Sequence, residues 1–328
     1  MRAEIKSLAT YVPPRLLTNA DLEKLVDTSN DWIMQRTGIR ERHVVDPGVA
    51  TSDLATEAAR VAIERAGLTP ADIDLIIVGT VTPDMLFPST ACLVQAKIGA
   101  KRAWGFDLSA ACSAFTYSLT VGAQMVSSGA VKYALVIGAD VMSSIIDYTD
   151  RSTCVIFGDG AGAVVIGASS SDEFGIFDFE CEVDGNGGPA LCMPAGGSRM
   201  PASHATVDQR LHYVKQEGQT VFKFAVTKTG DVCERLLKRN NLTANDIDLF
   251  VSHQANRRII MSAAERLGLP ADKVVINIDR FGNTTAATIP LALNDAISDG
   301  RVKKGDRLLL ASVGAGFTVG AVLMRWGI

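Results

Sequence analysis

The chain has 328 residues, of which 47% are hydrophobic and 21% charged, so it can bury a large core and form two domains or one duplicated domain. With 36 acidic and 32 basic residues, it lacks the positive excess typical of proteins that bind nucleic acids or membrane surfaces. No apolar run approaches the roughly 20 residues of a membrane span, and six cysteines without a Cys-x-x-Cys pair indicate reduced thiols in a cytoplasmic protein.

Strand-like and helix-like segments alternate along the chain. Short apolar runs predict buried strands, which are in order Leu75–Val78, Tyr133–Ile137, Val164–Ile166, Ile247–Val251, Val274–Ile278 and Leu308–Ala311. Longer segments with helical periodicity predict helices at Asp53–Ala66, Phe224–Asn240 and Asn256–Leu267. This alternation indicates an α/β fold in which helices cover sheets.

Two further helices are predicted to be buried on all sides. Cys112–Ser128 is rich in small and apolar residues around its whole circumference, and Gly129 follows it as a terminator. Asn283–Asp299 ends in the same way before Gly300. Pro290 must either kink this second helix or begin its regular part.

The sequence contains an internal repeat. Residues 68–75, LTPADIDL, reappear as LTANDIDL at 242–249, and a shorter match, GAVK and GRVK, follows each predicted buried helix. Two copies predict a duplicated domain with a pseudo-twofold axis, near which equivalent residues face each other. Cys112 and Asn283 each lie 17 residues before the glycine of the shorter match, so they are a candidate catalytic pair.

The first copy carries 13 additional residues between its Tyr133–Ile137 strand and the glycine turn before Val164. This insertion lies around Ser143–Thr153 and includes Arg151. Insertions on a duplicated scaffold form loops that carry function, so we expect it to form a wall of the site. The glycine- and proline-rich stretch Asp184–Gln209 is predicted to be a surface loop.

Cys112 is the candidate nucleophile. It follows the apolar run Trp104–Leu108 and a turn of small residues, and it opens the first buried helix. A thiol at a helix N-terminus feels the positive end of the helix dipole, so we expect a lowered pKa and a reactive thiolate. A buried structural role is commoner for cysteine, but the position and the repeat favour catalysis here.

His253 and Asn283 are candidate partners of this thiol. By the repeat His253 corresponds to Gly79, which places it after a central strand, at the edge where open α/β sheets bind ligands. A lone histidine is more often structural, yet the polar residues 254–256 that follow have little evident packing purpose. Asn283 could be a helix N-cap, but as the counterpart of Cys112 it is a candidate amide donor.

Two glycine-rich segments, Gly158–Gly162 and Gly314–Gly316, superficially resemble nucleotide-binding loops. Each precedes a strand rather than a helix, so neither forms a dinucleotide-binding unit. Both are predicted to be tight turns, and the backbone amide of Ala315 in the second is a candidate oxyanion donor.

Together these features make the chain resemble the thiolase superfamily and, within it, the β-ketoacyl-acyl-carrier-protein synthase III family. The resemblance covers essentially the whole chain. Its most specific segments are Asn30–Ile33, Arg36–Ile39, Ala110–Cys112, Phe157–Gly162, His253–Asn256 and Gly282–Thr284. A Cys-His-Asn set separates this family from the elongating synthases, which resemble Cys-His-His, and from thiolases, which use a second cysteine.

The resemblance implies a duplicated thiolase-like fold of five layers, α-β-α-β-α, with two buried central helices. We expect an N-terminal half at 1–171, with the nucleophile and the cap insertion, and a C-terminal half at 172–328, with the histidine and the asparagine. The family also implies a homodimer. No cofactor or metal is expected, because acyl-coenzyme A is a substrate.

The implied reaction is a decarboxylative Claisen condensation. A short acyl-coenzyme A primer and malonyl-acyl-carrier protein give 3-oxoacyl-acyl-carrier protein, which initiates fatty-acid synthesis. Cys112 would take the acyl group, with the backbone amides of Cys112 and Ala315 holding the oxyanion. His253 and Asn283 would stabilise the enolate that forms as carbon dioxide leaves.

The resemblance also assigns contacts with the substrates. Coenzyme A is expected to contact Thr28, Trp32, Arg36 and Arg151, with the adenine stacked on the tryptophan. The acyl pocket is expected at Phe87, Met142 and Val313, and the phenylalanine would come from the second subunit. The acidic carrier protein is expected to meet Arg258, assisted by Arg257 and Lys223. Without the family, the tryptophan could be a core anchor and the arginines ordinary surface charges.

Four positions depart from the family pattern, and three other functions stay open. The departures are Val313 for a frequent phenylalanine, Val319 for a tryptophan, Gln219 for an asparagine and Ala114 for a glycine.

A related condensing enzyme of secondary metabolism is one alternative function, and it would use another primer. A cysteine hydrolase has the same Cys-His-Asn order, with 141 residues from cysteine to histidine, but the papain-type context is absent. A non-catalytic acyl-binding homologue would not need all three residues.

Overall fold

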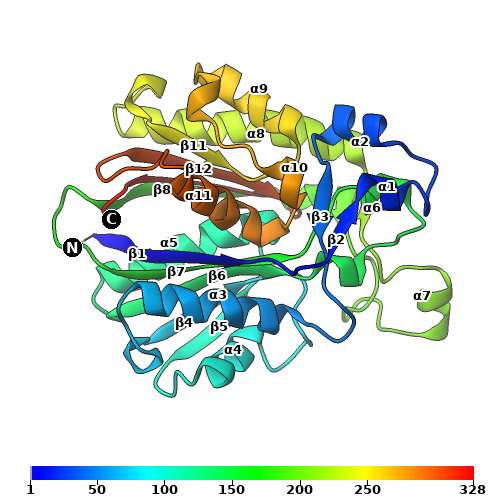
Figure 1. The fold of residues 1–328 in the computed structure, drawn as a ribbon, viewed down its shortest axis with the longest axis horizontal. Coiled ribbons are helices and arrows are strands. Elements are labelled where there is room, and N and C mark those ends of the chain that lie inside the picture. The colour runs from blue at the N-terminus through cyan, green and yellow to red at the C-terminus, as the bar shows by residue number, and fades with distance from the viewer. Residues whose placement is uncertain (1) are drawn as a thin grey trace.

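The computed structural model describes residues 2–328, whose helices and strands form five stacked layers (Figure 1). Two sheets alternate with three layers of helices. On one outer face, α3 (Thr51–Arg65) and α4 (Thr90–Ile98) cover the first sheet. On the other, α8 (Gly218–Arg239) covers the second sheet with α9 (Arg257–Leu267) beside it. The predicted five-layered α/β fold is confirmed.

The two sheets draw on different parts of the chain. The first has the order β1 (Ala3–Tyr11), β7 (Gly160–Ala168), β6 (Tyr133–Asp140), β4 (Leu75–Gly79), β5 (Trp104–Leu108). The second has the order β11 (Leu249–Ser252), β12 (Arg307–Gly314), β13 (Thr318–Arg325), β8 (Gly175–Val183). The parallel pairs, β4 with β5 and β6, and β11 with β12, end at the same edge of their sheets, which is where ligands bind in such folds. The boundary between halves at 171/172 stays a prediction.

The prediction of a strand at Val274–Ile278 was wrong. Only Val274 forms a bridge, to Phe250, and the chain then enters the short helix α10 (Ile278–Phe281). The Gln254 side chain explains the difference, because its amide donates to Val275 O (3.0 Å) and accepts from Asn277 N (3.0 Å). A buried side chain therefore takes the hydrogen bonds that a neighbouring strand would make.

Two central helices lie between the sheets, as predicted. The short 3₁₀ turn η2 (Ala111–Ser113) leads into α5 (Ala114–Ser127), and the corresponding turn η7 (Thr285–Ala287) leads into α11 (Thr288–Ser298). Pro290 falls in the first turn of α11, where its missing N–H breaks no helical hydrogen bond. It packs where a Cβ on Gly162 would approach to 2.3 Å, so only glycine fits in that strand.

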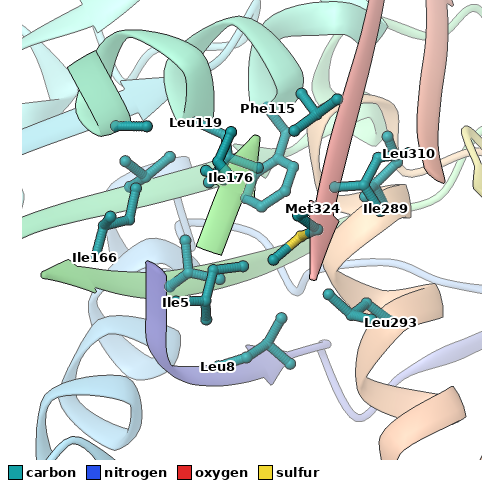
Figure 2. Packing of buried hydrophobic residues seen from close by; sticks show 14 of the residues in the cluster. Ile5, Leu8, Phe115, Leu119, Ile166, Ile176, Ile289, Leu293, Leu310 and Met324 are labelled. Carbon is teal, nitrogen blue, oxygen red and sulfur yellow. The ribbon is translucent and has the colours of Figure 1, made fainter. Parts of the chain in front are cut away.

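The core between the sheets is apolar and continuous (Figure 2). Phe115 and Leu119 of α5 and Ile289 and Leu293 of α11 point into it, and strand residues from both sheets, among them Ile5, Ile166, Leu310 and Met324, close around them. Full burial of each such side chain stabilises the fold by roughly 1.5–3 kcal/mol. The turns that carry Cys112 and Asn283 therefore lead into helices that are anchored in the core.

Smaller elements gather at the end of the layers opposite to the two chain termini (Figure 1). They are β2 (Leu16–Thr18), α1 (Asn19–Leu22), α2 (Asn30–Thr37), β3 (Glu41–His43), η3 (Met142–Ile145), α6 (Arg151–Cys154), and α7 (His204–Asp208). The stretch predicted as one surface loop, Asp184–Gln209, also contains η4 (Gly185–Ala190) and β9 (Leu191–Cys192), which pairs with β10 (Lys215–Gln216). It therefore carries more structure than its glycines and prolines indicated.

Candidate active site

Two cavities meet at Cys112. The wider one has a volume of about 540 Å³ and is also lined by His253 and Asn283. The narrower one has a volume of about 140 Å³, and apolar side chains such as Met142 and Ile145 line most of it. The structure thus brings the three candidate catalytic residues to one cavity, with a smaller apolar pocket beyond the thiol.

Cys112 lies in η2, directly before α5, and its side chain is buried. Burial raises the pKa of its thiol from 9.0 to about 12. This rise corresponds to about 4 kcal/mol against the thiolate, whereas a helix dipole contributes at most about 2 kcal/mol in its favour. The expected lowering of the pKa was therefore wrong for the free enzyme, because desolvation outweighs the dipole. The resting nucleophile is a neutral thiol.

His253 immediately follows β11, and its backbone N–H donates to Ala311 O (2.7 Å) on the neighbouring strand. The ring is buried, and Nδ1 lies 2.6 Å from the Thr288 hydroxyl at the start of α11. The other nitrogen, Nε2, has no hydrogen-bond partner among residues 2–328. Burial lowers the pKa of the ring to about 3, so His253 is neutral and offers one uncommitted nitrogen.

Asn283 is held by its backbone and by one side of its amide. Its N–H donates to Ile156 O (2.9 Å), its carbonyl accepts from Gly158 N (3.1 Å), and its Oδ1 accepts from Thr285 N (2.9 Å). The residue that caps α11 is Ala287, not Asn283. Because Oδ1 is occupied, the Nδ2 group is left to donate to a ligand. Gly282 has φ +64° and no room for a Cβ beside Ile156 O, so glycine is required before the asparagine.

The polar residues after His253 do have a packing purpose, which corrects the prediction. Gln254 is buried and also donates to Ser252 O (2.8 Å). Asn256 caps α9 by accepting from Arg258 N (2.9 Å) and donates to Arg36 O (2.9 Å) on α2. This turn therefore fixes β11, α9 and α2 relative to one another.

The turn that contains Ala315 lies against the Cys112 turn. A Cβ at Gly314 would lie 2.7 Å from Cys112 N. The Thr318 hydroxyl joins the two turns, because it lies 2.8 Å from Ala110 O and 3.2 Å from Ala315 O. The two predicted oxyanion donors therefore belong to segments that are held together.

Asp140 is a supporting residue that the sequence analysis missed. It ends β6, is fully buried, and accepts from both the side chains of Thr80 and Thr82 and the backbone of Ala286. Burial raises the pKa of its carboxyl to about 6, against the lowering effect of these hydrogen bonds. It ties the first sheet to the turn after Asn283. An acidic residue at the end of the predicted Tyr133–Ile137 strand was the signal available.

Comparison with known proteins identifies the family of the chain. Two family models match the chain: 3-oxoacyl-[acyl-carrier-protein] synthase III over residues 106–185 and the C-terminal domain of the same enzyme over residues 237–326. The β-ketoacyl-[acyl-carrier-protein] synthase III of Solibacter usitatus is 62% identical over 327 residues, covering 99% of both chains. The chain belongs to this family.

Further relatives belong to the same family. The β-ketoacyl-[acyl-carrier-protein] synthase III of Koribacter versatilis is 60% identical, over 99% of this chain and 98% of its own. The crystal structure of the corresponding synthase III from Aquifex aeolicus aligns with a TM-score of 0.91 at 43% identity, over 99% of this chain and 100% of that one. The predicted family and its condensing acyltransferase activity are confirmed, and the cysteine hydrolase is excluded.

The residues that the synthase III resemblance assigned to coenzyme A lie on α2, just before it, and on α6. The Arg151 guanidinium lies over the Trp32 ring at 4.8 Å from its centroid, and that of Arg36 lies at 5.8 Å. Arg151 also donates to Asp27 O (2.8 Å). The neighbouring Thr28 hydroxyl is buried without a partner among residues 2–328. The insertion around Ser143–Thr153 also contributes Ser152 to the lining of the wide cavity.

The three residues assigned to the acyl pocket lie in different places in the structure. Met142 lines the narrow cavity with Ala315, whereas Val313 lines the wide one. Phe87 is 84% exposed, and it lines neither cavity in the part of the chain that the structure describes. Of the departures from the family pattern, Gln219 also lines the wide cavity, while Val319 is buried in the core of the second sheet.

Of the basic residues assigned to the carrier protein, one lines the wide cavity. Arg258 lines it, with its guanidinium over Phe222 at 5.0 Å from the ring centroid. Arg257 precedes Arg258 in α9 and Lys223 lies on α8; both are exposed, and neither is among the residues that line the cavity. Within residues 2–328, no cluster of His, Cys, Asp or Glu could hold a metal ion, and no helix is long and apolar enough to cross a membrane.

Proposed function

We propose that the chain joins a short acyl-coenzyme A to malonyl-acyl-carrier protein by decarboxylative condensation at Cys112. The observation that carries this proposal is the position of the thiol at the junction of two cavities. The narrow apolar one suits an acyl chain, and the wide one, lined by His253 and Asn283, suits the arm of a thioester. The substrates fit the predicted cytoplasmic location.

In the first half of the reaction, the sulfur of Cys112 attacks the carbonyl carbon of the acyl thioester. The bond from that carbon to the sulfur of coenzyme A breaks, and the acyl group stays on the enzyme. The oxyanion of the tetrahedral intermediate is stabilised by the backbone amides of Cys112 and Ala315. Because the resting thiol is neutral, its proton must be accepted during the attack, and the neutral Nε2 of His253 is available in the same cavity.

In the second half, the malonyl thioester occupies the wide cavity with its oxygen between Nε2 of His253 and the Nδ2 group of Asn283. The carbon–carbon bond between the malonyl group and its carboxylate breaks and carbon dioxide leaves. The electron pair of that bond stays on the thioester and forms an enolate. The carbanion attacks the acyl carbon, and Cys112 leaves as the thiolate. Loss of carbon dioxide generates the nucleophile, so no carboxylate base is needed. Hydrogen-bond donors at the enolate oxygen each typically contribute about 3–4 kcal/mol.

Coenzyme A is proposed to bind where Arg151 of α6 meets Trp32 of α2. An adenine ring stacked on Trp32 would extend the contacts that Arg36 and Arg151 already make with this ring. The two guanidiniums would also pair with phosphates, and the unpartnered Thr28 hydroxyl offers a further hydrogen bond.

A direct assay tests the function. Radiolabelled acetyl-coenzyme A and malonyl-acyl-carrier protein should give a labelled 3-oxoacyl-carrier protein and carbon dioxide. Acyl-enzyme formation without a condensed product would contradict the proposal. Product formed only with a long or unusual primer would instead assign the chain to secondary metabolism.

Charge reversal at Arg258 should weaken use of the carrier protein. Arg258 lines the mouth where the acidic partner would dock, and it has no ion pair among residues 2–328. We expect Arg258→Glu to raise the KM for malonyl-acyl-carrier protein at least about threefold at low salt and to leave that for acyl-coenzyme A unchanged. Lys238→Glu is the control, because Lys238 is also basic but lies in the last turn of α8 and does not line the cavity. An equal rise in both KM values would contradict a carrier-protein site.

The face near Phe87 is proposed to bind a second copy of the chain. Leu86 and Phe87, in the loop after β4, are 82% and 84% exposed, and β5, which pairs with β4, is an edge strand. An edge strand beside large exposed apolar side chains favours association. Phe87 would then reach the partner's narrow cavity and limit the acyl chain. Sedimentation should give a dimer.

Shortening Phe87 should lengthen the accepted primer. The narrow cavity is small, so the wild type should prefer acetyl or propionyl over octanoyl-coenzyme A, at about 1 kcal/mol or more per rejected methylene. Phe87→Thr should shift the optimum toward longer chains without loss of acetyl transfer. A primer series on both proteins measures this, and a wild-type preference for octanoyl would end the proposal.

A further inference from the structure

The hydroxyl of Thr288 lies between His253 and a backbone carbonyl. Thr288 is the first residue of α11 and is buried. Its Oγ1 lies 2.6 Å from Nδ1 of His253 and donates to Thr285 O at 3.3 Å. A hydroxyl has one proton to donate and two lone pairs that accept. If that proton is directed to the carbonyl, the hydroxyl can serve the histidine only as an acceptor.

We propose that Thr288 is a positioning residue that keeps the proton of neutral His253 on Nδ1, so that Nε2 is the base for Cys112. This arrangement satisfies all three groups: Nδ1–H donates to Oγ1, and Oγ1–H donates to the carbonyl. The nitrogen left with a lone pair is Nε2, which is buried and has no partner among residues 2–328. The inference rests on the proposed function, because it concerns the proton of the nucleophile.

The proton then has a complete path. As Cys112 attacks the primer, its proton moves to Nε2 and its sulfur bonds to the acyl carbon. Coenzyme A leaves as a thiolate and takes a proton from water. Nε2–H now donates to the malonyl thioester oxygen and holds the enolate. When the new carbon–carbon bond forms and Cys112 is expelled, the thiolate recovers its proton from Nε2. The net reaction consumes one proton from water, which ends on coenzyme A.

Removing the hydroxyl should affect the two half-reactions unequally. In Thr288→Val a proton on Nδ1 would be buried without an acceptor, which is unfavourable. The ring should then carry its proton on Nε2, where water or substrate in the cavity accepts it. That tautomer cannot take the proton of Cys112, but it can still donate to the malonyl thioester. Acylation should therefore fall while decarboxylation is retained.

The experiment compares Thr288→Val with Thr288→Ser, which keeps the hydroxyl, in the full-length protein. We expect acetyl transfer to Cys112, followed by intact mass, to fall at least about tenfold in the valine variant. Carbon dioxide release from malonyl-acyl-carrier protein, measured on enzyme that has first been fully acylated, should change less than threefold, and serine should restore acylation. Thr284→Val is the matched control, because that hydroxyl in the same turn is buried without a partner among residues 2–328.

Nuclear magnetic resonance of ¹⁵N-labelled histidine reads the tautomer directly. The His253 signals, assigned by their loss in His253→Gln, should show the proton on Nδ1 in the wild type and on Nε2 in Thr288→Val. Equal loss of both half-reactions, no rescue by serine, or a wild-type proton on Nε2 would overturn the proposal. If the wild type transferred no acyl group, the proposed function would fail, and the spectrum would still decide the role of Thr288.

Discussion

Replacing Cys112 by alanine should abolish the acyl-enzyme and lower condensation by at least roughly 10⁴-fold. The sulfur is the proposed nucleophile at the junction of the two cavities, and alanine has no group that can attack a thioester. Only one buried atom is lost, so the free energy of unfolding should fall by no more than about 1 kcal/mol. Intact mass after incubation with acetyl-coenzyme A, together with a thermal melt, measures both effects.

Cys233→Ala is the matched control for this variant. Cys233 is also fully buried and is part of α8, in the core of the second sheet. The control should therefore acylate at the wild-type rate. A stable acyl group found on Cys112→Ala, for example at the half-buried Cys192 of the narrow cavity, would contradict the assignment of the nucleophile.

His253→Ala and Asn283→Ala should each reduce decarboxylation by about 10²- to 10³-fold, since each removes one donor to the enolate oxygen. They should differ in the first half-reaction. The histidine variant also loses the acceptor for the Cys112 proton, so it should acylate slowly, whereas the asparagine variant should acylate at nearly the normal rate. The rates of acyl-enzyme formation and of carbon dioxide release, measured separately, resolve the two roles.

Asn294→Ala is the control for the loss of an amide, because Asn294 lies on α11, the helix that follows the Asn283 turn. It should change neither rate. If both catalytic variants lost both steps to the same extent, the proposed division of labour would be wrong.

The sequence alone was sufficient for the architecture and for the three residues at the centre of the site. The repeat paired Cys112 with Asn283, and small and apolar residues on every face, followed by a glycine, placed the two central helices. Both signals are local or depend on spacing along the chain, so they survive without coordinates. The position of His253 followed from the same register, because equivalent strands end at the same edge.

Tertiary structure decided what surrounds those residues. Burial by both sheets sets the pKa of Cys112 and of His253, and it overrides the helix dipole that the local sequence indicated. The Gln254 side chain replaces a predicted strand, since its partners lie more than twenty residues away along the chain. Asp140 contacts Ala286, and Thr288 contacts His253, although the two residues of each pair are far apart in the sequence. Desolvation and long-range hydrogen bonds depend on which segments meet, and only the folded chain determines that.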